Sequence, residues 1–185
     1  MNPILLDFPA RIETDRLYLR PCLPGDGKLV MESIQHSVQE LKDWMPFANK
    51  QPSYEEIEEN IRRSYAKFIL REDIRLHIFL KETDTFIGST GLHKINWDVR
   101  IFEIGYWCDS RYAGNGYITE STKSLVQFAQ DILKANRIEI RCDPLNFKSR
   151  NIPEKLGFKL EGIQRKDCKS ADGKTLRDTC VFALT

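Results

Sequence analysis

The sequence predicts an α+β fold built around one mixed sheet, and two observations carry this prediction. Segments with the alternation of strands and segments with the spacing of amphipathic helices follow one another in the order β-α-α-β-β-β-α-β-α-β-β. The 185 residues, 41% of them hydrophobic and 30% charged, suit one globular domain that buries its own core. We therefore expect a single domain over residues 1–185, with its core at about 14–185.

The first half of the chain is predicted to hold one strand and several helices. Residues 15–21 alternate apolar and polar side chains and end at a proline, as a half-buried strand does. Two short helices are expected over 29–34 and 38–44, followed by an ordered loop rich in apolar side chains. A serine with a glutamate three residues later forms a capping box, which predicts the next helix over 53–71.

The second half is predicted to begin with an antiparallel meander, because two turn signals separate three strand-like runs. A long helix, a strand, a short helix and a final hairpin follow. Gly157 ends the short helix as a C′ glycine. The strands are expected at 75–82, 86–95, 100–108, 137–142, 158–168 and 175–184, and the helices at 117–134 and 148–156.

Composition argues against several classes of partner. The formal charge of +1 gives no basic field for a nucleic acid or a membrane surface, and no apolar run approaches the roughly 20 residues of a membrane span. The five cysteines are odd in number and scattered, which predicts reduced thiols and a cytoplasmic protein. The three histidines lack metal-ligand spacing, so we expect no metal. Exposed strand edges make a homodimer conceivable.

A glycine-rich turn stands where the strand 100–108 ends and the long helix begins. The run Arg111-Tyr112-Ala113-Gly114-Asn115-Gly116 lets the chain pass close to an anion, and the first N–H groups of a helix lack partners of their own. Thr119 stands where a dinucleotide fingerprint needs its third glycine, and no P-loop lysine follows. The residues therefore favour a phosphate site of another kind, with simple turn formation as the alternative.

The pattern R-x-x-G-x-G at this place resembles the pyrophosphate loop of GNAT acetyltransferases. About 30 residues later, the segment 146–158 is similar to the element that holds the far side of coenzyme A in that family. Residues 41–47 and 103–107 resemble the RimJ/RimL branch, and residues 91–93 resemble its YdaF-type bacillary members. The resemblance implies a mostly antiparallel sheet of six to seven strands with about four helices, splayed between its fourth and fifth strands.

The same resemblance implies acetyl-CoA as cosubstrate and direct transfer to an amine. The pantetheine arm would pair with the splayed end of the strand 100–108, and Asn146 would bond a pantetheine amide. The expected coenzyme-binding residues are Trp107, Cys108, Asp109, Arg111, Tyr112, Ala113, Gly114, Asn115, Gly116, Tyr117, Asn146 and Ser149. For Asn146 and Ser149 the alternative is helix capping. Cys108 is expected to pack without acting as a nucleophile.

Three side chains are candidates for the base that deprotonates the amine. Glu103 is the first candidate, because a desolvated carboxylate can take the proton through water; a structural, salt-bridged glutamate is the alternative. His93 is the second candidate, since imidazoles titrate near neutral pH; the alternative is a hydrogen-bonded histidine at a strand end with only a structural role. Asp167 is the third. Ser149 is expected to protonate the leaving thiolate.

The acceptor amine is left open by the sequence. Branch membership implies that the acceptor is the N-terminal α-amino group of a ribosomal protein. Trp44, Phe47 and His93 would then line the acceptor groove. The alternative for Trp44 and Phe47 is that they only fill the core. A small-molecule amine such as a polyamine, antibiotic or amino acid is the alternative. A coenzyme A-binding module without catalysis is a third possibility.

Overall fold

The computed structural model describes residues 2–50 and 52–185, and within them one eight-stranded sheet organises the chain. The strand order is β1-β2-β3-β4-β5-β6-β8-β7. All neighbours are antiparallel except β5 and β6, so the predicted mixed, mostly antiparallel sheet is confirmed. The strands are β1 (Ile12–Glu13), β2 (Leu17–Pro21), β3 (Ile74–Leu80), β4 (Phe86–Asn96), β5 (Ile101–Cys108), β6 (Arg137–Cys142), β7 (Lys159–Lys169) and β8 (Leu176–Leu184).

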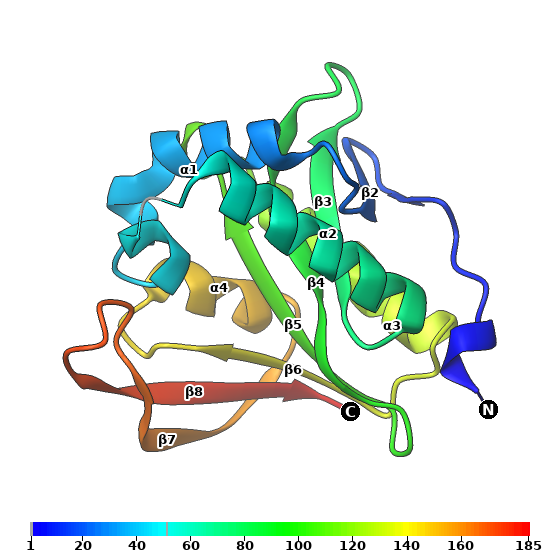
Figure 1. Cartoon of the computed structure of the whole chain (residues 1–185). Helices are drawn as coiled ribbons and strands as arrows, with labels where there is room; N and C mark the ends of the chain where they lie inside the picture. The colour runs from blue at the N-terminus through cyan, green and yellow to red at the C-terminus, as the bar shows by residue number, and fades with distance from the viewer. Residues whose placement is uncertain (1, 51) are drawn as a thin grey trace.

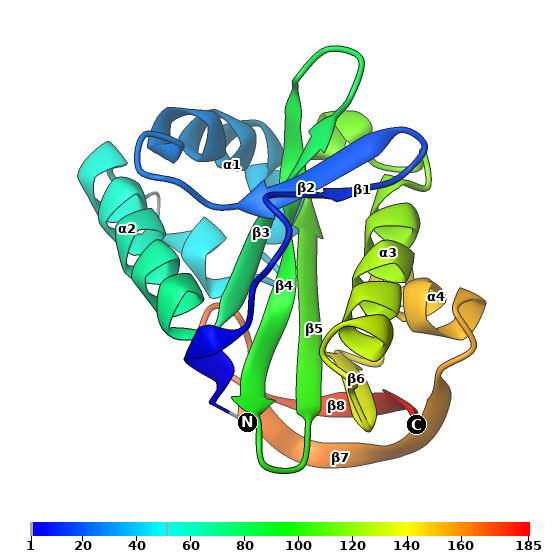
Figure 2. The ribbon, with the colours of Figure 1, turned by 90° about the vertical axis from the view of Figure 1, so that its right-hand side faces the viewer.

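Helices cover both faces of the sheet. α1 (Gly27–Leu41) and α2 (Tyr54–Leu70) lie on one face, and α3 (Tyr117–Asp131) and α4 (Phe147–Lys155) lie on the other (Figure 2). The larger buried cluster joins the sheet to α3 through residues such as Phe102, Ile104 and Leu125. A second cluster joins α1 and α2 to the opposite face. The sheet is therefore sandwiched, as an α+β fold with two apolar faces requires.

The strand count exceeds the predicted six to seven because β1 is too short to show an alternating pattern. Its two residues pair with Tyr18 and Leu19 of β2 at the sheet edge. At the other edge, every residue of β7 is exposed, and register shifts interrupt its pairing with β8. Irregular, exposed edges of this kind oppose strand addition by another chain.

α1 corrects the prediction of two short helices over 29–34 and 38–44. The helix runs without a break because its polar residues face a polar partner. Ser33 Oγ donates to Asp109 at 2.7 Å, and the buried Ser37 accepts from the Ser110 N–H at 2.8 Å. Ser33 and Ser37 therefore lie on the inner face of α1, against the turn that follows β5.

The capping box that opens α2 is confirmed in both directions, with Ser53 and Glu56 bonding each other's backbone N–H groups. The meander of β3, β4 and β5 follows as predicted. At the end of α4, Gly157 has φ +80° and the Phe158 N–H bonds the Pro153 carbonyl, so the predicted C′ glycine is also confirmed.

A buried polar cluster fixes the start of α1 against the sheet. The Asp26 carboxylate accepts two bonds from Arg20 at 2.8 Å and lies 2.9 Å from Nδ1 of the buried His77. Burial alone would raise the pKa of Asp26, but the hydrogen bonds from Arg20 and His77 outweigh it and lower that pKa below its ordinary value. Burial lowers the pKa of His77.

Candidate functional site

The site is built around the place where β5 and β6 separate. Their parallel pairing runs from Ile101–Arg137 to Ile104–Ile140 and then stops. Beyond it β5 continues with β4 as its partner, while β6 continues with β8, and α4 lies beside the divergence (Figure 1). Residues 105–108 therefore present a strand edge without a neighbouring strand among the described residues, which confirms the predicted splay.

The glycine turn lies at the end of this free edge. Gly114 and Gly116 have φ of +83° and +78°, a backbone region that favours glycine, and Gly116 is the N-cap of α3. In the described part of the chain, no acceptor bonds the backbone N–H groups of residues 114–119. Unbonded N–H donors at a helix N-terminus, where the partial charge is positive, are groups that bind anions in proteins.

Arg111 and Asp109 shape the turn from within. The Asp109 carboxylate is fully buried, and Arg111 bonds it at 2.6 Å and extends to Glu32 at 3.4 Å. Burial opposes ionisation of Asp109, but the Arg111 hydrogen bonds dominate and lower its pKa. The Asp109 N–H also bonds the Ile87 carbonyl. Both residues were predicted to bind the coenzyme, and in this structure their side chains bind each other.

The outer part of the turn is held by a residue that sequence reasoning missed. Arg16 donates to the Asn115 carbonyl at 3.1 Å, forms an ion pair with Glu120 at 2.6 Å and lies over the Tyr117 ring. Tyr112 packs against the main core. Arg16 precedes β2 and lies far from the turn in sequence, so no local pattern could have revealed the contact. Asn115 and Tyr117 are thus fixed beside the free N–H groups, whereas Ala113 ends the short 3₁₀ turn Ser110–Tyr112.

Asn146 and Ser149 lie on the α3 and α4 face of the opening. Asn146 is the N-cap of α4 and accepts from the Ser149 N–H at 3.1 Å, so helix capping is confirmed for this pair. The Asn146 side-chain amide nitrogen donates no hydrogen bond within the residues described. It is therefore available to a ligand while the carbonyl oxygen caps the helix.

Tyr106 joins Ser149 across the opening, and sequence reasoning missed this residue as well. Its phenol donates to the Ser149 carbonyl at 3.0 Å and accepts from Ser149 Oγ at 3.4 Å. Pro153 explains why this carbonyl has no N–H partner within α4. It lies in the seventh position of α4, not in the first turn, and has no N–H to donate to the residue four positions earlier. Burial raises the pKa of Tyr106, so its phenol remains a donor.

Cys108 lies at the end of the free edge, yet its chemistry is that of a packing residue. Its thiol lies 3.3 Å from the Asp109 carbonyl. Burial raises the pKa of Cys108 to about 12, which keeps the sulfur protonated and a poor nucleophile.

The candidate bases gather on the opposite face of the sheet. His93 and Glu103 are direct partners across β4 and β5, so their side chains share one face. Glu103 bonds Lys94 at 2.9 Å and lies 3.8 Å from Arg141, which also binds Asp167 at 2.8 Å. A hydrogen bond from Thr179 and then Arg141 lower the pKa of Asp167.

His93 has a different partner, which sequence reasoning did not identify. Its Nδ1 lies 2.7 Å from Asp73 Oδ2, and both side chains are partly exposed. The ring lies against Gly91 and Gly105, because a Cβ added to either glycine would come within about 3 Å of it. Asp73 is 20 residues away in sequence, in the segment that joins α2 to β3, so neither strand nor helix spacing could have paired the two.

Phe47 and Trp44 lie toward the same face of the sheet but in different surroundings. Phe47 packs edge-on against Trp107, 5.9 Å between ring centroids, and Trp107 contacts Phe86. Trp44 lies under the Arg177 guanidinium at 5.1 Å. Both are half-buried, so Phe47 and Trp107 present an apolar wall that is also part of the smaller core cluster.

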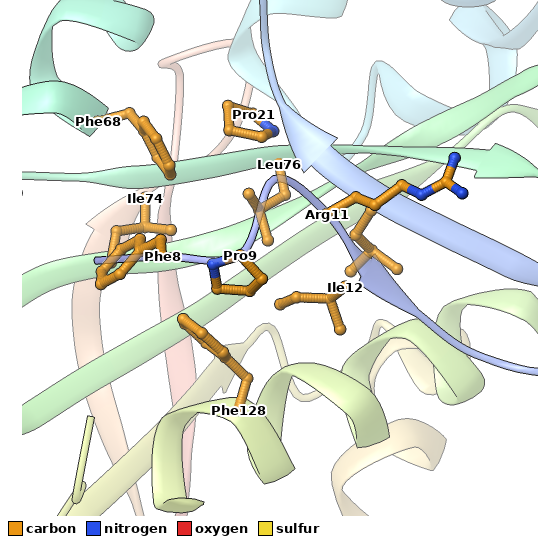
Figure 3. Close-up of a pocket in the computed structure, with 10 residues that line it drawn as sticks. Phe8, Pro9, Arg11, Ile12, Pro21, Phe68, Ile74, Leu76 and Phe128 are labelled. Atoms are coloured by element: carbon orange, nitrogen blue, oxygen red, sulfur yellow. The ribbon is translucent and has the colours of Figure 1, made fainter. Parts of the chain in front are cut away.

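A cavity elsewhere in the chain does not compete with this site. It lies between the N-terminal segment, β2, β3 and α3, and its lining is almost entirely apolar (Figure 3). Its volume of about 10 Å³ is at the lower limit for one water molecule. Within residues 2–50 and 52–185, no helix is long and apolar enough to cross a membrane, and no three potential metal ligands cluster.

The chain is similar in sequence to known acetyltransferases. The family described as Acetyltransferase (GNAT) domain matches residues 16–159, a range that includes the glycine turn and α4. The putative ribosomal N-acetyltransferase YdaF of Bacillus subtilis (strain 168) is 31% identical over 156 residues, 82% of each chain. The ribosomal-protein-serine acetyltransferase of Escherichia coli (strain K12) is 27% identical over 128 residues, 68% of this chain and 71% of that one.

A solved structure shows the same fold. The microcin C7 self-immunity acetyltransferase MccE, in complex with acetyl-CoA and AMP, superposes with a TM-score of 0.87 over 93% of both chains. Its sequence is 20% identical, so the likeness concerns the arrangement of the elements.

Proposed function

The chain belongs to the RimJ/RimL-like branch of the GNAT acetyltransferases and is an N-acetyltransferase, and from this we propose that it transfers acetyl from acetyl-CoA to the N-terminal α-amino group of a ribosomal protein. The observation that carries the proposal is the open edge of β5 next to the glycine turn. A pantetheine arm requires a free strand edge, and a pyrophosphate requires free N–H donors. This site offers both within a few residues of each other.

The coenzyme would be held largely by backbone groups. The N–H groups of residues 114–119 would bind the pyrophosphate, and the backbone of Trp107 and Cys108 would pair with the pantetheine amides. Arg111 and Asp109 would contribute by fixing the turn, and Asn146 through its free amide nitrogen. When bound, acetyl-CoA supplies a thioester whose acetyl group an unprotonated amine can attack.

Ser149 would protonate the departing thiolate, with Tyr106 as the residue that positions it. Two hydroxyl groups meet at the opening on the α4 face, and the Tyr106 phenol is anchored by the Ser149 carbonyl. The Ser149 hydroxyl, which donates to the phenol oxygen here, would rotate to give its proton to the sulfur, and the Tyr106 phenol, whose own proton bonds the Ser149 carbonyl, would keep Ser149 in place. Ser149 was the predicted acid, and the structure supports adding Tyr106 as its partner.

The charges beside the opening support a peptide α-amine over a polyamine as acceptor. The carboxylates of Glu103 and Asp167 are each paired with a cation, Lys94 or Arg141. A polyamine would meet these two cations as well as the carboxylates, whereas a peptide N-terminus brings a single charge and an apolar or polar first side chain. The Phe47 and Trp107 wall offers a contact for that side chain.

The proposal is tested by supplying acetyl-CoA with a panel of acceptors and measuring free thiol release. The panel contains peptides with ribosomal-protein N-termini, the same peptides with blocked N-termini, polyamines, amino acids and aminoglycosides. We expect turnover with free N-terminal peptides and none with blocked ones. Faster turnover of a polyamine would overturn the acceptor assignment, and acetyl-CoA binding without turnover of any amine would identify a non-catalytic coenzyme A module.

A further inference from the structure

We propose that Asp73 and His93 form the proton-accepting pair of this enzyme: Asp73 orients the imidazole through Nδ1, and Nε2 takes the proton of the acceptor ammonium. The inference rests on the proposed acetyl transfer and adds to it a residue, Asp73, that positions the base. In the reaction the N–H bond of the ammonium breaks, its proton goes to Nε2, and the freed amine attacks the thioester carbonyl. The C–N bond forms as the C–S bond breaks, and the second proton that the nitrogen loses replaces the one that Ser149 gives to the coenzyme A thiolate.

The hydrogen bond to Asp73 selects one form of the ring. A carboxylate 2.7 Å from Nδ1 accepts the proton carried there, so the neutral imidazole keeps its lone pair on Nε2. Both side chains retain some exposure, 28% for His93 and 23% for Asp73, so the pair is reachable by an acceptor. A proton taken up at Nε2 would convert the neutral hydrogen bond into an ion pair, which is the stronger interaction.

Two glycines give the ring its place. A Cβ at Gly91 would lie 3.0 Å from Cε1 and Nε2 of His93, and one at Gly105 would lie 3.1 Å from Cδ2 and 3.3 Å from Nε2. The Cε1–Nε2–Cδ2 edge of the imidazole therefore lies against two strands where neither carries a side chain. Gly105 is the first residue of β5 beyond the last pair with β6, Ile104–Ile140. Nε2 thus lies where the opening begins.

The two faces of the opening carry opposite roles. Phe102 and Ile104 of β5 point into the core beside α3, and Tyr106 continues this face to Ser149. Gly105, between them in the strand, exposes the other face, on which the His93 ring lies. The proton acceptor for the amine and the proton donor for the thiolate therefore flank one opening from opposite sides.

Glu103 is less suited to the role in this structure. Its Oε2 bonds Lys94 at 2.9 Å and lies 3.8 Å from Arg141, so taking up a proton there would discharge an existing ion pair. The groups that face His93 are then Asp73 from the α2–β3 segment and Glu103 from β5, with Lys94 and Arg141 beyond Glu103.

The test compares His93→Gln and Asp73→Asn with His36→Gln, which changes an exposed histidine whose ring bonds the Glu32 carbonyl of its own helix, α1. We expect His93→Gln to lower kcat by about 100-fold or more and Asp73→Asn by about 10-fold, with the KM for acetyl-CoA unchanged. The acidic limb of the pH–rate profile should be lost in His93→Gln and shifted in Asp73→Asn. Asp73→Glu should recover part of the loss, and His36→Gln should match the wild type.

Heteronuclear NMR of the wild-type imidazole gives a readout that needs no turnover, and the proposal expects the neutral-ring proton on Nδ1. A proton on Nε2 would overturn the pair, and so would a His93→Gln enzyme with wild-type kcat and pH profile. The latter result would leave acetyl transfer itself standing, whereas a wild-type protein that acetylates no amine would refute both. If His93→Gln fails to fold, Gly105→Ala, which displaces the ring, must lower kcat by itself.

Discussion

Replacing Gly116 by alanine separates the role of the glycine turn in folding from its role in binding. Gly116 has φ +78°, and an added Cβ would meet only Arg16 Nη2 at 3.7 Å, an ordinary contact. The cost is therefore conformational, about 1–2 kcal/mol for a side chain in the left-handed region. For a domain of this size, that corresponds to a fall of roughly 2–8 °C in Tm.

Gly173 provides a matched control for this substitution. It has φ +76°, an added Cβ would meet nothing within 4 Å, and it lies in the turn between β7 and β8, outside the opening. Gly173→Ala should therefore cause a similar loss of Tm and leave acetyl-CoA binding unchanged.

Only Gly116→Ala should weaken binding, because it strains the turn whose N–H groups would face the pyrophosphate. Losing one hydrogen bond to a charged group costs about 1.5–3 kcal/mol, or about tenfold or more in Kd. Thermal unfolding gives the first quantity and isothermal calorimetry with acetyl-CoA gives the second. Equal Kd values for the two variants, at equal losses of Tm, would refute the assignment of the turn to the pyrophosphate.

Two further substitutions test the contact between Tyr106 and Ser149 and the buried cluster around Asp26 and His77. Pro153→Ala gives α4 an N–H that competes with Tyr106 for the Ser149 carbonyl, so kcat should fall about tenfold while Tm holds or rises; an unchanged kcat would contradict the anchoring role. Asp26 and His77 both have lowered pKa values, so the unfolded chain binds their protons first and stability falls on acidification, below about pH 6.5 for His77 and about pH 4 for Asp26. The wild type should therefore exceed Asp26→Asn in urea midpoint at pH 7, and this advantage should shrink steadily as the pH falls below about 4 towards the lowered pKa of the folded state; an advantage that stays constant from about pH 5 down to about pH 2 would contradict the titration of Asp26.

The parts of the fold that the sequence predicted correctly are those with a local cause. The capping box of α2, the C′ glycine of α4 and the strands of the meander each depend on residues within one or two turns of chain. The break predicted within α1 was wrong because the sequence around Ser33 and Ser37 does not show which distant residues will contact these side chains. Ser33 and Ser37 are polar on the inner side of the helix because Asp109 and Ser110 lie opposite.

The features of the site also separate into those with a local cause in the sequence and those that depend on distant residues. The positions of the glycine turn and of Asn146 were predicted from local sequence, and the structure has Gly116 and Asn146 as the N-caps of α3 and α4. Asp73 and Tyr106 were missed because their partners, His93 and Ser149, lie 20 and 43 residues away, and no periodicity connects them. The pairing of β4 with β5 explains the place of the His93 ring, because Gly91 and Gly105 are direct partners on these two strands and leave room for it.

Pro153 shows how an apparent fault in a sequence can indicate a long-range contact. A proline in the seventh position of a helix removes one N–H, and the carbonyl four residues earlier must find another donor or remain unpaired at a cost. Here that carbonyl belongs to Ser149, and the donor is the Tyr106 phenol at 3.0 Å. The proline therefore requires a donor from outside α4 at the residue predicted to protonate the thiolate, and β5, the strand that opens away from β6, supplies it.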